Sequence, residues 1–203
     1  MPDQSHDHEP VGTDQPGGNS ANVVDLASAQ HSRLRAEASR LRATNEALIG
    51  LAKANLAAQA QTHAAVLAIL EAESLSALDH KLGGRVAGAL GVDAVRILIE
   101  GHQPLKSARC ILGAAPGLSD MLLGEGAERL GRTDPRFADS LYGAQASRLG
   151  SQALCRFETA GHVGVLCLAA REPGAFEPEQ SADLVHFLAR VLERRMNPWL
   201  RAE

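Results

Sequence analysis

The chain has 203 residues, of which 45% are hydrophobic, and this suffices for one domain of ordinary size with an extension. The charged residues are unevenly distributed. The first twenty residues carry four acidic groups and no Lys or Arg. The rest of the chain carries all 20 basic groups and the other 20 of the 24 acidic groups, so it is neutral. A neutral body lacks the basic field that supplies most nucleic-acid affinity, and aromatic residues make up only 3%. We therefore expect no nucleic-acid partner.

Residues 1–20 contain three prolines and three glycines with almost no apolar side chains, and this predicts a disordered acidic tail. No stretch reaches the roughly 18 to 20 apolar residues that span a bilayer. A signal peptide would begin with basic and then apolar residues, unlike this start. We expect a cytoplasmic protein without a membrane partner.

Residues 21–72 have the composition of one long amphipathic helix, free of proline and rich in Ala, Leu, Arg and Gln. The tetrapeptide Arg-Leu-Arg-Ala occurs at 33–36 and again at 40–43, so Leu34, Leu41 and Leu48 fall at heptad spacing. If these leucines occupy d positions, Asn45 falls at an a position, where it helps to fix register in two-stranded coils. We predict a parallel homodimer through these four residues; the alternative is that the stripe packs on the chain's own domain.

A second helical stripe follows and is expected to lie on the domain, with a bend between residues 70 and 75. Its members are Leu67, Leu70, Leu75, Leu78, Leu82, Val86 and Leu90.

Residues 73–203 are predicted to form one α+β domain. The alternation Val95, Ile97, Ile99 indicates a strand, and residues 107–112 are expected to pair beside it. Residues 113–150 are expected to form loops with short helices. Residues 152–157 and 163–170 predict a hairpin whose second strand is apolar on both faces, so helices should cover both sides of the sheet. A closing helix is expected from Pro178.

Signatures of catalysis are absent from the sequence, which has no phosphate-binding glycine loop, zinc-protease motif or hydrolase elbow. The three cysteines have no CxxC spacing and lie among apolar residues, which favours reduced core thiols. The histidines show no ligand spacing. We expect no enzymatic activity, metal or cofactor.

Five arginines gather in and near the loop-rich segment and indicate a pocket for a small anionic ligand. The alternative is a solvated surface on which they pair with neighbouring carboxylates, as charged runs usually do. The arginines are Arg109, Arg129, Arg132, Arg136 and Arg148.

The chain resembles a bacterial family of unknown function, DUF484. The resemblance is carried by the helix at 33–48, the strand entry at 90–95, the element at 141–143, the strand at 151–154 and the ending at 164–176 with the last helix, and it covers most of residues 22–200. It implies a GAF-like fold, in which an antiparallel sheet has the first and last helices on one face and a ligand-sized cavity under loops on the other. GAF relatives bind small molecules and often dimerise, but fold alone does not determine function.

The candidate ligand-binding residues are Arg109, Arg132, Tyr142, Arg148 and Ser151. The first hypothesis for function is a dimeric regulatory or small-molecule-sensing GAF-like signalling module. The second is a ligand-free scaffold that presents its domain and N-terminal helix to a protein partner; an uncharacterised enzyme comes third. A solid core under residues 113–150 would favour the scaffold, and an enclosed polar cavity would favour the sensor.

Overall fold

The computed structural model describes the backbone of residues 19–176 and 178–202, and the side chains of residues 28–176 and 182–202. The chain divides into two compact units, residues 1–53 and 54–203, which are described separately. In the first, the described residues belong to helix α1 (Asn19–Leu70), which continues into the second. The tail predicted for residues 1–20 lies, up to residue 18, outside the described part of the chain.

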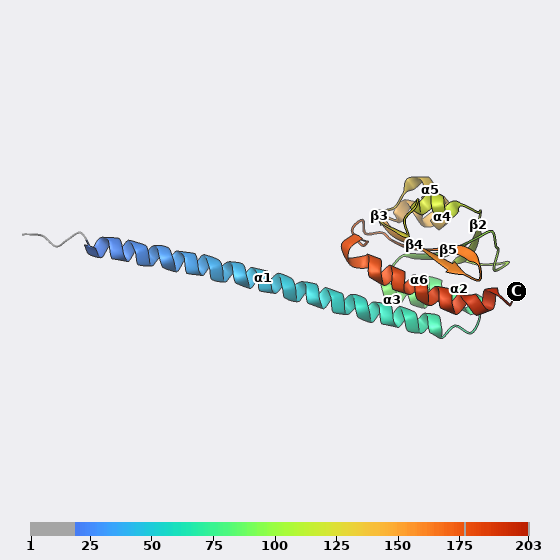
Figure 1. Ribbon diagram of the computed structural model, residues 1–203, viewed down its shortest axis with the longest axis horizontal. Helices are drawn as coiled ribbons and strands as arrows, with labels where there is room; N and C mark the ends of the chain where they lie inside the picture. Colours follow the sequence, from blue (N-terminus) through green and yellow to red (C-terminus); the bar gives the residue numbers. More distant parts are fainter. Residues whose placement is uncertain (1–18, 177, 203) are drawn as a thin grey trace, which may run out of the picture. The chain divides into compact units, whose positions relative to one another are not determined.

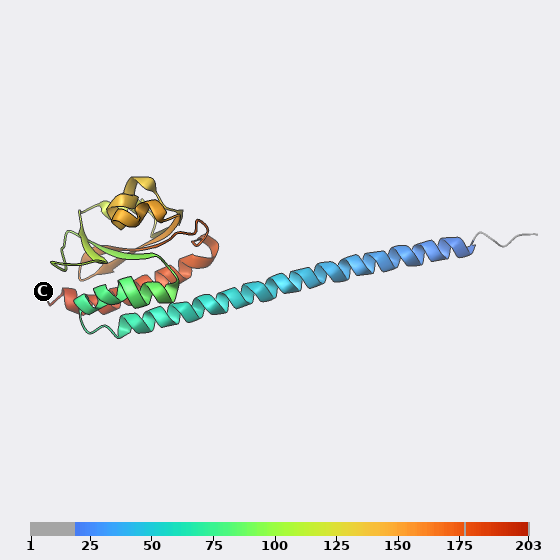
Figure 2. The same cartoon turned by 180° about the vertical axis from the view of Figure 1, so that it is seen from behind.

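The second unit contains a five-stranded sheet with helices on both of its faces (Figures 1 and 2). The elements that follow α1 are α2 (Leu75–Lys81), the π-helix η1 (Leu82–Val86), α3 (Ala87–Leu90), β1 (Ala94–Glu100), β2 (Ile111–Ala114), α4 (Leu118–Leu123), β3 (Glu128–Arg132), α5 (Pro135–Tyr142), the 3-10 helix η2 (Gly143–Arg148), β4 (Ser151–Thr159), β5 (His162–Ala170) and α6 (Pro178–Leu200).

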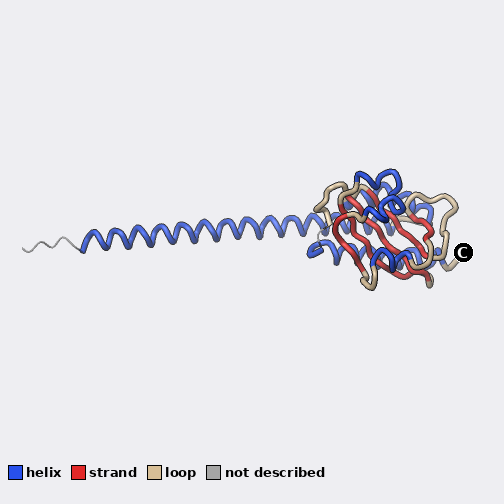
Figure 3. Tube along the Cα trace, turned by 90° about the horizontal axis from the view of Figure 1, so that it is seen from above, coloured by secondary structure: helices blue, strands red, loops and turns tan. Residues whose placement is uncertain are grey.

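The strands lie in the order β2-β1-β5-β4-β3, and the red tubes of Figure 3 show them side by side. All neighbouring pairs are antiparallel except β1 and β2, which are parallel. Helices α2, α3 and α6 cover one face, and α4 and α5 cover the other (Figure 1). This confirms the predicted α+β class, the mainly antiparallel sheet and the long preceding helix.

The predicted hairpin is confirmed as β4 and β5. Its two-residue turn has Ala160 and Gly161 with φ of 51° and 85°, the left-handed pair that matches the twist of tight hairpins. Strand β5 lies between β1 and β4, and its alternating residues enter different cores. Leu166 packs under α2 and α6, whereas Cys167 packs under α4 and α5. Burial on both faces explains its continuous run of apolar and small residues.

The predicted bend is confirmed, because α1 ends at Leu70 and α2 begins at Leu75 behind the N-cap Ser74. The predicted burial of Leu67 and Leu70 is wrong: they are 61% and 51% exposed. Helix α1 instead buries a neighbouring face, made of Ala65, Ala68, Ile69 and, just beyond its end, Ala72. This buried face combines three alanines with the larger Ile69, whereas Leu67 and Leu70 lie on the solvent side of the helix.

The strand predicted at 107–112 begins later, at Ile111, and runs parallel to β1. Residues 101–110 return the chain to the start of β1 without a crossover helix. Within the described residues, no helix combines the length and apolar character needed to cross a membrane.

Replacing Leu166 with Asp is expected to unfold the second unit. Leu166 is 1% exposed in the central strand, and an unpaired buried carboxylate costs several kcal/mol against a total stability of roughly 5 to 15 kcal/mol. The measurement is thermal unfolding followed by circular dichroism. Met121→Asp is the matched control, because Met121 is 65% exposed, and its melting temperature should stay near that of the wild type. A wild-type melting temperature for L166D would contradict the burial of β5.

Candidate functional site

The carboxylate of Asp79 joins α2 to the start of β2. Its Oδ1 accepts hydrogen bonds from the backbone N–H groups of Cys110 and Ile111, both at 2.8 Å, and its Oδ2 accepts one from Arg109 at 3.0 Å. Asp79 is only 4% exposed. The three donors compensate for the water that the carboxylate loses on burial, so α2 and the chain entering β2 are held together.

A polar cavity of about 310 Å³ lies beside this contact. It lies at the end of the sheet where β1 begins before β2 does. The pairing of the two strands starts with Ile97 and Ile111, so Arg96, one residue earlier on β1, has no partner on β2. The lining combines two arginines, a histidine, an amide and the helix backbone of η1. The lining residues are Asp79, His80, Gly83, Gly84, Arg96, Arg109, Cys110 and Gln145.

Arg96 is the half-buried cation of this cavity. One of its guanidinium nitrogens donates to the carbonyl of Val95 at 2.8 Å and lies 3.9 Å from Sγ of Cys110. Among the side chains that the structure describes, no carboxylate lies within ion-pair distance of it. A guanidinium carries five N–H donors, so Arg96 retains unused donors beside the cavity.

The cavity wall on the helical side is a π-helix. Gly83 in η1 lies against Cys110, and a Cβ at this position would stand 3.1 Å from the cysteine Sγ. A Cβ at position 83 would therefore require Cys110 or η1 to shift by a few tenths of an ångström. Single-turn π-helices are rare and occur frequently at functional sites, which is a second reason to regard this cavity as the candidate site.

The predicted ligand-binding residues are distributed over several places. Arg109 lines the cavity described above, and Arg148 lines a separate, smaller one of about 110 Å³ that shares only Gln145 with it. Arg132 lies exposed on the edge strand β3, where its Cα partner is Ser151.

The two uncharged candidates are buried and have internal partners. The hydroxyl of Tyr142 donates to the amide oxygen of Gln152 at 3.1 Å, and burial, together with Cys167, raises the pKa of Tyr142 well above its usual range. Ser151 donates to the carbonyl of Glu172. The structure therefore brings only Arg109 of the five to the main cavity, and adds Arg96, which lies between Val95 and Ile97 in the predicted strand.

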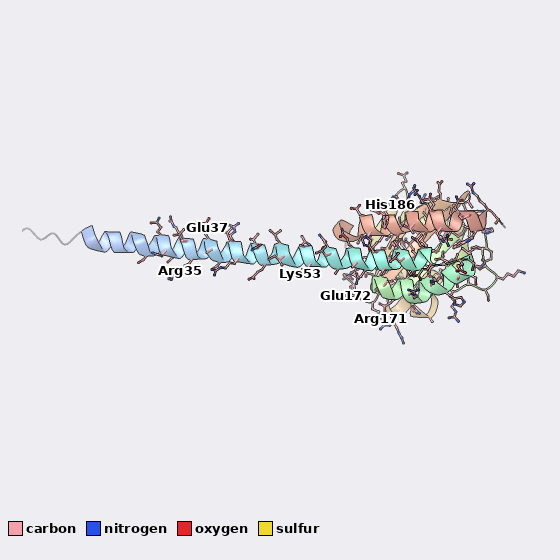
Figure 4. The ribbon with its side chains drawn as sticks, turned by 90° about the horizontal axis from the view of Figure 1, so that it is seen from below. Arg35, Glu37, Lys53, Arg171, Glu172 and His186 are labelled. Atoms are coloured by element: carbon pink, nitrogen blue, oxygen red, sulfur yellow. The ribbon has the colours of Figure 1, made fainter. Side chains whose placement is uncertain are left out.

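A second cluster of side chains lies between the sheet and α6, at β3 and β4. Glu128 on β3 and Cys155 on β4 are directly paired across the two strands, and His186 reaches them from α6, where Figure 4 labels it. Sγ of Cys155 lies 3.9 Å from Nδ1 of His186, and one ligand atom from each of the three residues lies within 4.8 Å of the others. Cys155 is fully buried, whereas Glu128 and His186 are exposed.

All three cysteines are free and buried. Burial, reinforced by Glu128, raises the pKa of the Cys155 thiol to about 11, and burial raises that of Cys167 to about 12. Burial also raises the pKa of Cys110, against the opposing effect of Arg96. At neutral pH the three side chains are therefore protonated thiols and poor nucleophiles.

Comparison with protein families gives a match that covers nearly the whole chain. The family described as "Protein of unknown function, DUF484" matches residues 17–201. The chain belongs to the DUF484 family. No curated protein matches it. Membership confirms the resemblance carried by the first helix, the strands and the last helix, and assigns no activity to this DUF484 protein.

Neither cluster has a local signature in the sequence. Residues 79, 96 and 109 come from α2, β1 and a loop, and residues 128, 155 and 186 come from β3, β4 and α6. For the cavity, an indication in the sequence was Arg96, an arginine within a mainly apolar strand. For the second, only the strand register and the docking of α6 bring the residues together.

Replacing Asp79 with Ala should destabilise the domain by about 3 kcal/mol or more, because it leaves buried N–H donors unpaired at a cost of about 1 to 3 kcal/mol each. Asp79→Asn is the matched control, since its amide oxygen can still accept from Cys110 and Ile111, and it should lose less. The measurement is denaturant unfolding of each protein at one concentration. Equal stability of D79A and the wild type would show that the contact does not hold β2.

Proposed function

We propose that this DUF484 protein is a dimeric regulatory module that binds a small anionic molecule in the cavity of Arg96 and Arg109. The observation that carries the proposal is Arg96, a half-buried guanidinium with unused donors and no carboxylate partner among the described side chains. A cation that has lost part of its hydration is unfavourable unless hydrogen bonds and opposite charge replace the water. A bound anion would supply both.

The chemistry of the lining indicates the class of ligand. Two guanidinium groups suit a carboxylate or a phosphate, whose oxygens match the paired N–H donors of arginine. His80 and Gln145 add further polar contacts. A volume of about 310 Å³ lies at the lower end of the range for ligand cavities, so a small metabolite suits it better than a dinucleotide.

We propose that the protein binds this anion without catalysing a reaction on it. Cys110 is the thiol in the cavity lining, and it is buried and protonated at neutral pH, which makes it a poor nucleophile. The carboxylate of Asp79 already accepts three backbone hydrogen bonds, so it is committed to the fold and is not available as a general base.

The ligand-free scaffold is the second candidate, and a specific observation favours it. Under residues 113–150, where the GAF-like resemblance implies a cavity, Leu122, Leu141 and Tyr142 pack against the sheet in a continuous apolar core. By the criterion set from the sequence, this apolar core favours the scaffold, although residues 133–149 of the segment also line a cavity of about 280 Å³. The polar cavity beside Arg96 borders this segment only at Gln145, and it keeps the sensor as the first proposal.

The proposed dimer rests on the exposed stripe of the first unit. Leu34, Leu41 and Leu48 are 57%, 63% and 60% exposed, although leucine at heptad spacing is typical of a buried seam. Asn45 stands at the a position between the last two. Glu37 at g and Arg42 at the next e give the opposite charges that cross between parallel chains. Figure 4 shows the side chains of Arg35 and Glu37 projecting from α1. We infer that the partner is a second copy of the chain.

Ligand binding is tested by thermal melting against a panel of small carboxylates and phosphates. A ligand at 100 times its dissociation constant should stabilise the wild type by about 2.7 kcal/mol. Arg96→Met keeps the length of the side chain and removes its charge, so it should abolish this stabilisation while the ligand-free protein melts no lower. Arg132→Ala is the control, because this exposed arginine lies on β3 and does not line the cavity. If no compound shifts the wild type, the scaffold replaces the sensor.

Dimerisation is tested by sedimentation velocity of the full-length chain. The wild type should sediment as a dimer, and the double variant L34D/L41D should be monomeric or dissociate at much higher concentration, because four carboxylates would face one another in the seam. Ala36→Asp with Ala43→Asp is the matched control, since these positions lie at f, away from the seam. A monomeric wild type, or a double variant that remains fully dimeric, would contradict the proposed seam.

A further inference from the structure

We propose that Glu128, Cys155 and His186 form a binding site for a zinc-type divalent cation, with the fourth position open to solvent. The site is independent of the anion cavity, with which it shares no residue. Thiolate sulfur, imidazole nitrogen and carboxylate oxygen are the three donor types that zinc uses in proteins. Three protein ligands with one open position is the arrangement of zinc ions that retain a water molecule or accept a further ligand.

Strand register explains why two of the ligands meet. Glu128 and Cys155 are cross-strand partners in the antiparallel pair β3 and β4, so their side chains emerge on the same face of the sheet, a few ångströms apart. That face is the one covered by α6, because Cys155 belongs to the core that also contains Val185 and Leu188 of this helix. His186 follows the buried Val185 directly, so its ring lies at the edge of the buried face of α6. From there its Nδ1 lies 3.9 Å from Sγ of Cys155.

The distances are close to those that a metal requires. A tetrahedral zinc ion with bonds of about 2.0 to 2.3 Å holds its ligand atoms roughly 3.3 to 3.6 Å apart. Sγ of Cys155 and Nδ1 of His186 are already 3.9 Å apart, and all three ligand atoms lie within 4.8 Å of one another. Glu128 and His186 are exposed, so small rotations of two solvent-facing side chains close the remaining gap while Cys155 stays in place.

The surroundings favour a cation over the other uses of these residues. Within the described part of the chain, no Lys or Arg lies within ion-pair distance of Glu128, so its carboxylate faces the thiol without a cation. A nucleophilic cysteine must ionise before its substrate arrives, which the burial of Cys155 opposes. A metal ligand loses its proton only as the metal binds, and the ion itself compensates the negative charge.

The test uses Co²⁺ as a spectroscopic probe of the full-length protein, stripped of metal with a chelator and kept reduced. One equivalent of Co²⁺ should produce the visible bands of tetrahedral cobalt and a near-ultraviolet thiolate-to-cobalt charge-transfer band, and one equivalent of Zn²⁺ should remove them. Cys155→Ser should lose the charge-transfer band. His186→Gln and Glu128→Gln should weaken Co²⁺ binding by at least the roughly 10- to 100-fold that loss of an outer-shell partner costs.

Cys110→Ser and Cys167→Ser are the matched controls, since both replace buried thiols outside the cluster and should keep the bands. Circular dichroism of each metal-free variant checks folding, and His186→Gln, a surface change, keeps the test valid if C155S is unstable. The proposal is overturned if the wild type shows no charge-transfer band at a tenfold excess of Co²⁺. It is equally overturned if the spectrum and affinity survive in H186Q, or if C110S and C167S abolish the band as C155S does.

Discussion

The buried carboxylate of Asp79 is the contact on which the arrangement of this domain depends. It accepts three backbone N–H groups from the chain entering β2, and so joins elements that are thirty residues apart. A strand with only four residues makes few ladder hydrogen bonds of its own. The carboxylate adds strong, charge-assisted bonds at the end where β2 begins, and this places the strand parallel to β1 and under α2.

The candidate site follows from this constraint. Because β2 starts at Ile111, β1 has no strand partner on that side at Arg96, and the space there is lined by helix, loop and strand residues together. The π-helix η1 and the glycine at position 83 let the helical layer lie close to Cys110. The domain thus combines a five-stranded sheet with a polar cavity beside the start of β2, where Arg96 is half-buried.

The buried faces of helix α1 and strand β5 are made of different side chains. Helix α1 buries Ala65, Ala68 and Ile69 against the domain and turns Leu67 and Leu70 to solvent, so its buried face is not the leucine stripe that the sequence predicts. Strand β5, by contrast, is buried on both faces. Leu166 lies in one core, and Val165 and Cys167 lie in the other. The sheet thus separates two interiors, and both residue clusters described above border the one under α2 and α6, through Cys110 and Cys155.

The sequence by itself determined the long helix, the bend after Leu70, the hairpin of β4 and β5, the closing helix and the α+β class, because these depend on local periodicity, turn residues and proline. It also led to the DUF484 family. It did not determine the parallel pairing of β2, the outward direction of Leu67, or the grouping of Arg96 with Arg109 and of Cys155 with His186. Those features depend on a buried carboxylate, on strand register and on which face of a helix docks, and each joins residues far apart in the chain. Contacts of that kind leave no spacing in the sequence, so only the tertiary structure decided them.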